Sequence, residues 1–409
     1  MSVKSSKLGT CLYEAESSFG ETTAFGSPIR LPILDSVDLS GFKQPKIDPA
    51  RVVQRRNEGT KRITGPQSGS FKTKFHLTGH GGVTSSTAPL TSLATLLGYV
   101  LGGSQAGAAG TTVASGSTAT VVNTAASATY AAGQMCRIGA GGVGTDARGC
   151  GQFVSIASHT TTVMTLLTGV SVAPNAADVI HSCELAFAAD SATVTGLRFL
   201  LQTGNLSIAA HGCYATDFAI GGLNPGEIPF VEITWSCAWW TFSTATFPSA
   251  VSVETFSPAP VAAGSFFLAA SGTATRATRN VRDFAISYKL GMAPEMGVNG
   301  ASEDQTIVAC ARTPDAITVT WTEDADDATL TPALTALFDA NAIHHGLLTL
   351  NVVPGAAIGL RFPALYFDAD RPVQADKDGL NRIQVTMTSH VSTVTTNDLT
   401  LSPFVIGFA

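Results

Sequence analysis

Short runs in which apolar and polar residues alternate dominate this chain. Over Ser70–Leu77, apolar side chains and a threonine take one set of alternate positions, and two lysines and a histidine take the other. Further along, Ile317, Val319 and Trp321 alternate with threonines. Successive side chains of a strand point to opposite faces, so each run predicts a half-buried β-strand. The chain is therefore expected to be mainly β.

Each of these strands is followed by a short helical pattern. Pro89 stands at a first-turn position before the first one, and Pro332 before the second. The apolar residues at helical spacing are Leu90, Leu93, Leu97 and Leu101 in the first, and Leu334, Leu337 and Phe338 in the second. One short helix is thus predicted after each strand.

The order strand, short helix, strands, long turn, strand occurs twice. The later strands of the first group are predicted at Leu197–Leu201, Leu206–Ile208, Cys213–Ile220 and around Val231, Ile233 and Trp235. Those of the second group are predicted at Leu347–Val353, Ile358–Phe367 and around Ile383, Val385 and Met387. We expect a duplicated, mostly antiparallel β-sandwich or barrel with one short helix per copy.

A nearly uncharged interruption, residues 103–189, separates the helix of the first copy from its later strands. It holds several short strand-like pieces separated by Gly, Asn and Pro, which favours a small inserted all-β barrel or sandwich. The expected organisation is residues 1–102 and 190–250 for the first copy, 103–189 for the insert and 251–409 for the second copy.

Charge is scarce and unevenly placed. Only 13% of the 409 residues are charged, against about 25% in a typical soluble protein. Such a surface favours contact with other protein chains, although a stable secreted β-protein is an alternative. The net charge of −6 argues against electrostatic nucleic-acid binding by the whole chain. Basic residues gather between Lys43 and Lys74, and the second copy is acidic.

Several other protein classes are excluded by short-range features. Residues 1–20 lack the apolar core of a secretory signal, and the densest apolar stretch, Pro89–Gly102, is too short to span a bilayer. The chain has seven cysteines at wide spacing and no C-x-x-C pair. We therefore expect buried free thiols, made in a reducing cytoplasm, and no membrane insertion.

No motif predicts a catalytic, cofactor or metal site. Gly139–Gly144 matches G-x-G-x-x-G, but a strand pattern follows it instead of a helix that could hold a pyrophosphate. His344 and His345 lack a third ligand. Trp235, Trp239 and Trp240 leave open an aromatic sugar-binding platform, although a core strand end or a subunit contact is favoured.

An ordered set of segments, none distinctive alone, resembles a known family. The segments are Glu21–Pro28, Arg55–Gly65, the strand Ser70–Leu77, the helix start Ala88–Leu90, the stretch from Gly212 to Trp235, and Tyr130–Ile156 within the insert. Together they resemble the major tail tube proteins of long, non-contractile-tailed bacteriophages. The stretch Tyr130–Ile156 is similar to small domains inserted in phage tail proteins.

The resemblance implies a structural protein of the virion, not an enzyme. In that family, strands of neighbouring subunits join into closed rings, and the rings stack into a tube. The tube houses the tape-measure protein, meets tail terminator and distal tail proteins at its ends, and conducts DNA during ejection. With two copies per chain, three chains would form a pseudo-sixfold ring; a hexamer is the alternative.

The resemblance and the charge pattern together suggest candidate contact residues. Arg55, Arg56, Lys61 and Arg62 are expected to bridge stacked rings. Glu323, Asp324, Asp326 and Asp327 are expected at an acidic lumen or ring face, where they would repel phosphate. Competing classes are another virion β-protein, such as a distal tail or head-decoration protein, a carbohydrate-binding adhesin, and a hydrolase with an unrecognised site.

Overall fold

The structure is a computed structural model, and it is mainly β with two short helices. It describes residues 9–35, 37–44, 46–47, 63–64, 67–78, 92–107, 110–126, 130–139, 152–176, 178–189, 194–203, 206–242, 252–253, 260–261, 264–270, 278–279, 281–297, 307–312, 316–324, 330–339, 343–350, 357–367, 373–377, 380–389, 399–400 and 402–409. The mainly-β prediction is confirmed.

Five antiparallel strands form what we call the N-terminal set. In order of pairing they are β1 (Gly9–Ala15), β14 (Leu197–Thr203), β15 (Leu206–Gly221), β16 (Phe230–Cys237) and β5 (Gly69–His76). The 16-residue strand β15 joins two segments that the sequence pattern separated, because the chain passes through Gly212 at φ 58° without leaving the sheet.

The C-terminal set has the same order of pairings. Its strands are β19 (Gly264–Ala270), β25 (His344–Leu350), β26 (Ile358–Phe367), β28 (Leu380–Ser389) and β24 (Ile317–Asp324). The second strand of each set also shifts register near its start, between Leu197 and Phe199 in β14 and between His344 and Gly346 in β25. The two sets therefore share a register shift at the equivalent place as well as the order of pairing.

A short helix follows the edge strand of each set in the chain. Helix α1 (Ser92–Leu101) follows β5 and helix α2 (Leu330–Asp339) follows β24. Leu93, Leu97 and Leu101 of α1 are buried in the main core, as their spacing predicts. Pro89 and Leu90 lie outside the described residues.

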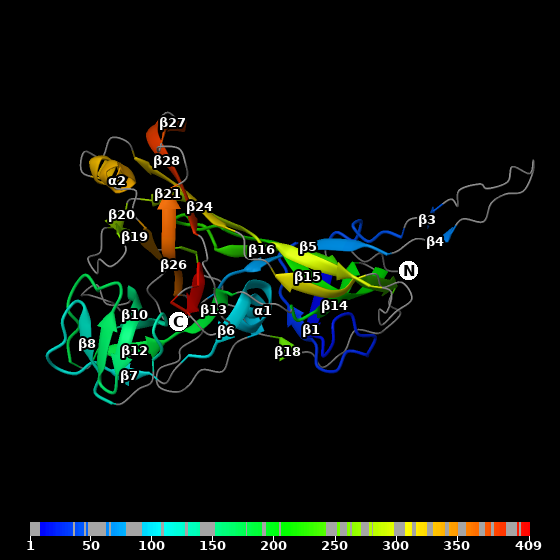
Figure 1. Ribbon diagram of the computed structural model, residues 1–409, viewed down its shortest axis with the longest axis horizontal. Helices are drawn as coiled ribbons and strands as arrows, with labels where there is room; N and C mark the ends of the chain where they lie inside the picture. The colour runs from blue at the N-terminus through cyan, green and yellow to red at the C-terminus, as the bar shows by residue number, and fades with distance from the viewer. Residues whose placement is uncertain are drawn as a thin grey trace, which may run out of the picture.

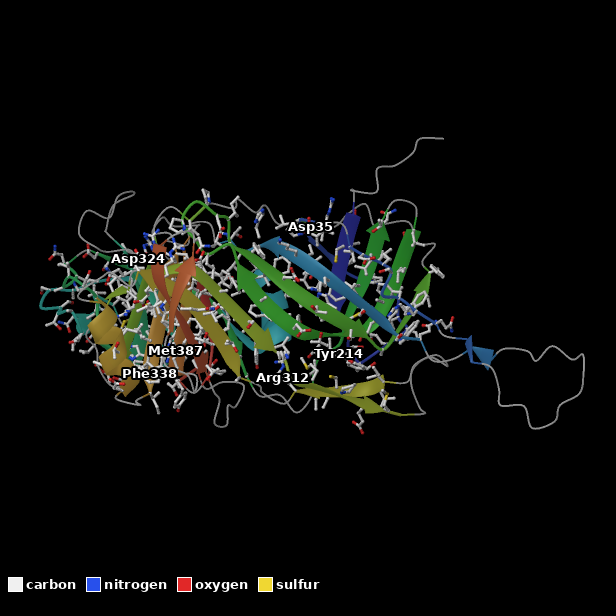
Figure 2. The ribbon with its side chains drawn as sticks, turned by 90° about the horizontal axis from the view of Figure 1, so that it is seen from above. Asp35, Tyr214, Arg312, Asp324, Phe338 and Met387 are labelled. Atoms are coloured by element: carbon white, nitrogen blue, oxygen red, sulfur yellow. The ribbon has the colours of Figure 1, made fainter. Side chains whose placement is uncertain are left out.

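One ladder joins the sets into one sheet, and a second extends the sheet beyond the C-terminal set. Strand β21 (Val281–Lys289) pairs with β24 on one side and with Asp217–Ile220 of β15 on the other. Strand β29 (Val405–Phe408) pairs with β26 and with β13 (Glu184–Ala188), which in turn pairs with β6 (Gly102–Gln105). Strands of both sets therefore run side by side (Figure 2).

The insert is a closed six-stranded barrel. Its strands, in order of pairing, are β7 (Thr111–Thr112), β12 (Val179–Ser182), β9 (Met135–Gly139), β10 (Gln152–Thr160), β11 (Val163–Leu166) and β8 (Val121–Asn123). A bridge between Val113 and Thr124 closes the ring of strands. The barrel lies beside the C-terminal set (Figure 1). The barrel strands occupy only residues 111–182 of the predicted insert 103–189, because β6 and β13 at its two ends belong to the large sheet.

The remaining strands are short or lie at the margins. They are β2 (Ile29–Leu31), β3 (Lys46–Ile47), β4 (Ile63–Thr64), β17 (Trp239–Phe242), β18 (Ser252–Val253), β20 (Thr278–Arg279), β22 (Met292–Met296), β23 (Ile307–Arg312) and β27 (Val373–Lys377). Strands β3 and β4 pair with each other and project from the end of the molecule opposite the barrel (Figure 1).

One apolar core runs beneath both sets. It contains α1 together with the inward side chains of the shared sheet, including Phe71, Trp235, Ile286 and Trp321. The barrel has a separate core around Val154, Ile156 and Met164. Burial of apolar area is the main favourable term in folding, so the two sets fold around a common centre.

Candidate assembly surface

Both sets contribute to one polar surface, which is the face of strands β5, β16, β15, β21, β24 and β28 that points away from the main core. The strands contribute in the order β5, β16, β15, β21, β24 and β28. Along each of them, residues that alternate with the core positions point to this face. We call it the hydroxyl face, for the reason given next.

Serine and threonine fill the part of this face that crosses from β21 to β28. Ser287 lies opposite Thr318, which lies opposite Thr388. In the next row, Thr320 lies opposite Thr386. Cross-strand threonine pairs stabilise a sheet without charge. This region is therefore polar and uncharged.

Charges of both signs occupy the rest of the hydroxyl face. Lys72 of β5 donates to Glu232 of β16 at 2.8 Å, and this hydrogen bond raises the pKa of Lys72. Asp217 of β15 lies directly opposite Lys289 of β21. Among the described residues, the face carries charges of both signs together with hydroxyls and is not uniformly acidic.

A segment of the N-terminal set takes the place that β21 has in the C-terminal set. Residues 33–35 and 37–43 lie beside β5, with bridges from Ile33 to Phe75 and from Lys43 to Ser68, as β21 runs beside β24. The other side of β21 pairs with β15. No described strand pairs with the other side of residues 33–35 and 37–43, and Leu34 in this segment is 40% exposed. Asp35 lies at the margin of the molecule there (Figure 2).

The hairpin of β22 and β23 ties the C-terminal set to helix α1. The buried guanidinium of Arg312 donates to the carbonyl oxygens of Val100 at 2.6 Å and Tyr99 at 3.0 Å. These carbonyls belong to the last turn of α1, where the helix leaves acceptors unpaired and favours a cation. The Val194 amide also donates to the Cys310 carbonyl at 2.9 Å. Figure 2 labels Arg312 on this hairpin.

The predicted acidic residues do not act together. Glu323 is 3% exposed and accepts hydrogen bonds from Arg279, at 3.0 Å and 2.5 Å, and from the Trp321 indole at 2.8 Å. Its charge is therefore paired inside the chain and not presented at a lumen or ring face. Glu323 and Asp324 are the last two residues of β24.

Asp324 alone of the acidic candidates is partly exposed in the described chain. Its carboxylate lies 3.3 Å from Arg282 and 4.0 Å from Arg382. It stands at one margin of the row of strands (Figure 2). Asp326 and Asp327 lie outside the described residues, as do the predicted ring-bridging residues Arg55, Arg56, Lys61 and Arg62.

The tryptophans do not form an exposed platform. Trp235 is 1% exposed and donates to Thr73, and Trp239 and Trp240 are each 6% exposed. Trp239 stacks on His211, and the Trp240 indole donates to the Ser68 carbonyl. The aromatic faces are covered, which contradicts a sugar-binding use of these three residues and supports the core interpretation.

Other chemistry is equally sparse in the described part of the chain. No group of three or more His, Cys, Asp or Glu residues there could hold a metal ion. His344 and His345 are buried within β25. The six described cysteines are free and buried, and Cys150 lies outside the described residues. None of the described helices is both long enough and apolar enough to cross a bilayer.

One buried polar cluster was not predicted from the sequence. Glu16 accepts hydrogen bonds from the amides of Gly20 at 2.7 Å and Gly212 at 2.8 Å. Burial raises the pKa of Glu16 to about 7, against the lowering effect of those two bonds. His211 lies 3.9 Å away, and burial lowers its pKa to about 4. Nothing in the sequence around Glu16, which directly follows a strand, indicates that its carboxylate is buried.

Comparison with family models and with curated proteins finds no match for this chain. Its function is therefore argued from the geometry above.

Proposed function

We propose that this chain is a structural subunit of a bacteriophage tail tube, in which rings of subunits stack around a lumen. The observation that carries the proposal is the repeated order of pairing, β1-β14-β15-β16-β5 and β19-β25-β26-β28-β24, with a helix after each edge strand. We interpret the two sets as duplicate copies of one tube domain. On this interpretation the chain is the duplicated β-sandwich or barrel that the sequence order suggests.

The contact between the two sets supports ring formation. Strand β21 of the C-terminal set adds to β15 of the N-terminal set, so the contact is head-to-tail. Repeating a head-to-tail contact gives a closed ring if the rotation closes. In the next chain of the ring, residues 33–43 would take the place of β21. Three chains would then supply six copies, and closure would remove exposed sheet edges. A ring of six chains is the alternative.

The hydroxyl face is proposed to line the lumen. It is the face of the shared sheet opposite the main core, and its serines, threonines and charges of both signs offer DNA neither a uniformly cationic nor an apolar surface. Lys and Arg contacts to phosphate dominate DNA affinity, so a lumen of this kind would let the genome pass without adhesion. This replaces the net acidic lumen that the charge pattern suggested.

The remaining partners follow from the same proposal. The tube would enclose the tape-measure protein and meet the tail terminator and distal tail proteins at its ends, in the virion.

The candidates Arg55, Arg56, Lys61 and Arg62 would bridge stacked rings. If tubes of normal length still assemble in high yield when all four are changed to serine, that bridging role is wrong.

Negative-stain microscopy of the purified full chain tests the proposal directly. We expect rings with a central hole or tubes built from them. A compact monomer that never assembles would overturn the tail-tube proposal and favour a decoration protein. Binding of polysaccharide by such a monomer would favour an adhesin that uses residues other than Trp235, Trp239 and Trp240.

A further inference from the structure

A second apolar cluster joins the inserted barrel to the C-terminal set. Met135 and Phe153 of the barrel pack in it against Phe267 of β19, Leu347 of β25 and Val405 of β29. Strand β13, which leads out of the barrel, contributes further buried residues on the same side. The barrel is inserted between α1 and β14 of the N-terminal set, yet it is packed on the other set.

The contact is closely fitted at Gly359 of β26. A Cβ atom at this position would come within 2.6 Å of the Met135 Cε and of the Phe153 ring. Real Cβ atoms do not approach neighbours this closely, so any side chain here would displace the barrel from β26. The absence of a side chain is what allows the contact.

Arg361, two residues further along β26, holds the barrel by hydrogen bonds. Its side chain is buried, and it donates to the carbonyl oxygens of Gly133 at 2.5 Å and Leu399 at 3.3 Å. Gly133 belongs to the barrel and Leu399 to the C-terminal set. Burial lowers the pKa of Arg361 to about 10, which reflects the cost of placing a cation there. A charge retained at such a cost points to a specific positioning role.

The N-terminal set offers an internal comparison. In the β25–β26 ladder Arg361 lies opposite Leu347, and the corresponding pair in the β14–β15 ladder is Ala209 opposite Leu200. There the same face of the sheet is covered by Phe25 of the N-terminal segment. The arginine is therefore present in the set that carries the barrel and absent from the equivalent position of the other.

We infer that the inserted barrel is an intramolecular clamp, with Arg361 as its positioning residue, and that it fixes the orientation of the N-terminal set relative to the C-terminal set. The barrel is tied covalently to the N-terminal side through α1, which runs directly into β6, and through the connection from β13 to β14, and it is docked on the C-terminal set through Gly359 and Arg361. A change in the angle between the sets would have to break one of these attachments.

A consequence for assembly rests on the proposed function. Helix α2 ends at Asp339 and β25 begins at His344, so the C-terminal set has no barrel at the equivalent place. A ring of these chains would contain clamped junctions within each chain and unclamped junctions between chains. The clamp would fix the curvature of each chain before assembly, and the junction between chains would be the one at which rings open.

Spin-label distances in the full-length monomer test the clamp without reference to rings. Labels would be placed at Leu206→Cys on β15 of the N-terminal set and Gln384→Cys on β28 of the C-terminal set, both exposed, in a Cys150→Ser background. We expect one narrow distance distribution. Arg361→Met should add a second, broader population, and Gly359→Ala, which adds one methyl group, should do so without removing the guanidinium.

Arg198→Met is the matched control. Arg198 is also a buried arginine on a sheet, and it donates to Thr23 and pairs with Glu14 within the N-terminal set. Its loss should lower the melting temperature and leave the label distance unchanged. If Gly359→Ala and a folded Arg361→Met both keep the single narrow distance, the clamp is wrong. Failure of the wild-type chain to form rings would overturn the tail-tube proposal and leave the clamp standing.

Discussion

Asp217 of β15 and Lys289 of β21 face each other across the ladder that joins the two strand sets. Both side chains are exposed on the hydroxyl face, and the ladder of which they are part makes one sheet out of two sets. We expect Asp217→Lys or Lys289→Asp alone to destabilise the chain by placing like charges opposite each other. The exchange of both should recover the loss, with a coupling energy of about 0.2–1 kcal/mol in a double-mutant cycle. Additive effects would mean that the two charges do not interact.

The ion pair of Arg279 and Glu323 should matter far more than an exposed one. Both side chains are buried, so Glu323→Gln or Arg279→Met leaves one charge without its partner and should cost about 3–5 kcal/mol of unfolding free energy. Glu232→Gln, which breaks the exposed pair with Lys72, should cost at most about 1 kcal/mol. Equal losses in chemical denaturation would contradict the burial of Glu323.

The Glu16 cluster predicts opposite pH dependences for two variants. Glu16 binds its proton more tightly in the folded chain, so its contribution to stability is full below about pH 4.5 and is lost as the pH rises to about 7. His211 binds its proton more weakly when folded, so its contribution is present above about pH 6.5 and is lost as the pH falls through about 4.

Between pH 4.5 and 6.5 the two effects cancel. Each amounts to at most about 1.4 kcal/mol per pH unit. Relative to wild type, Glu16→Gln should therefore gain stability as the pH rises through this window, and His211→Gln should lose it. Denaturant titrations at several pH values measure both. A difference from wild type that does not change with pH would show that the replaced group does not titrate as described.

Residues 33–43 are proposed to form the edge that meets the next chain. Leu34→Asp would place a charge on this edge, at a side chain 40% exposed, and should reduce ring formation while the melting temperature stays close to wild type. Val172→Asp is the control, because Val172 is an exposed apolar residue of the barrel. Ring yields by size-exclusion chromatography separate the two. A larger loss for Val172→Asp would move the contact to the barrel.

Much of the fold could be predicted from the hydrophobic pattern, because strands such as β5, β16 and β24 are buried mainly on one face. The run Ile358–Phe367 is β26 residue for residue, and the alternation of Ile317, Val319 and Trp321 lies in β24. The continuity of β15 could not be predicted, since Gly212 breaks the pattern without ending the strand. The assignment of β6 and β13 to the large sheet depends on pairing with β29, more than 200 residues away.

Fewer features of the candidate site than of the fold could be predicted from the sequence. Glu323 looks like the first residue of an acidic turn, and only the approach of Arg279, 44 residues earlier, makes it a buried acceptor. The docking of the barrel through Arg361 likewise depends on Gly133, 228 residues away in the chain. Local patterns predict which residues of a strand face the core. The partner of a buried charge depends instead on the tertiary fold.

Native mass spectrometry of isolated rings, combined with cryo-electron microscopy of the same sample, tests the central claim most directly. We predict rings of three chains in which six similar densities, alternately the N-terminal and C-terminal sets, surround a lumen lined by the hydroxyl face. A ring of six chains would contradict the use of both sets as tube domains, and a chain that stays monomeric would contradict the tail-tube proposal itself.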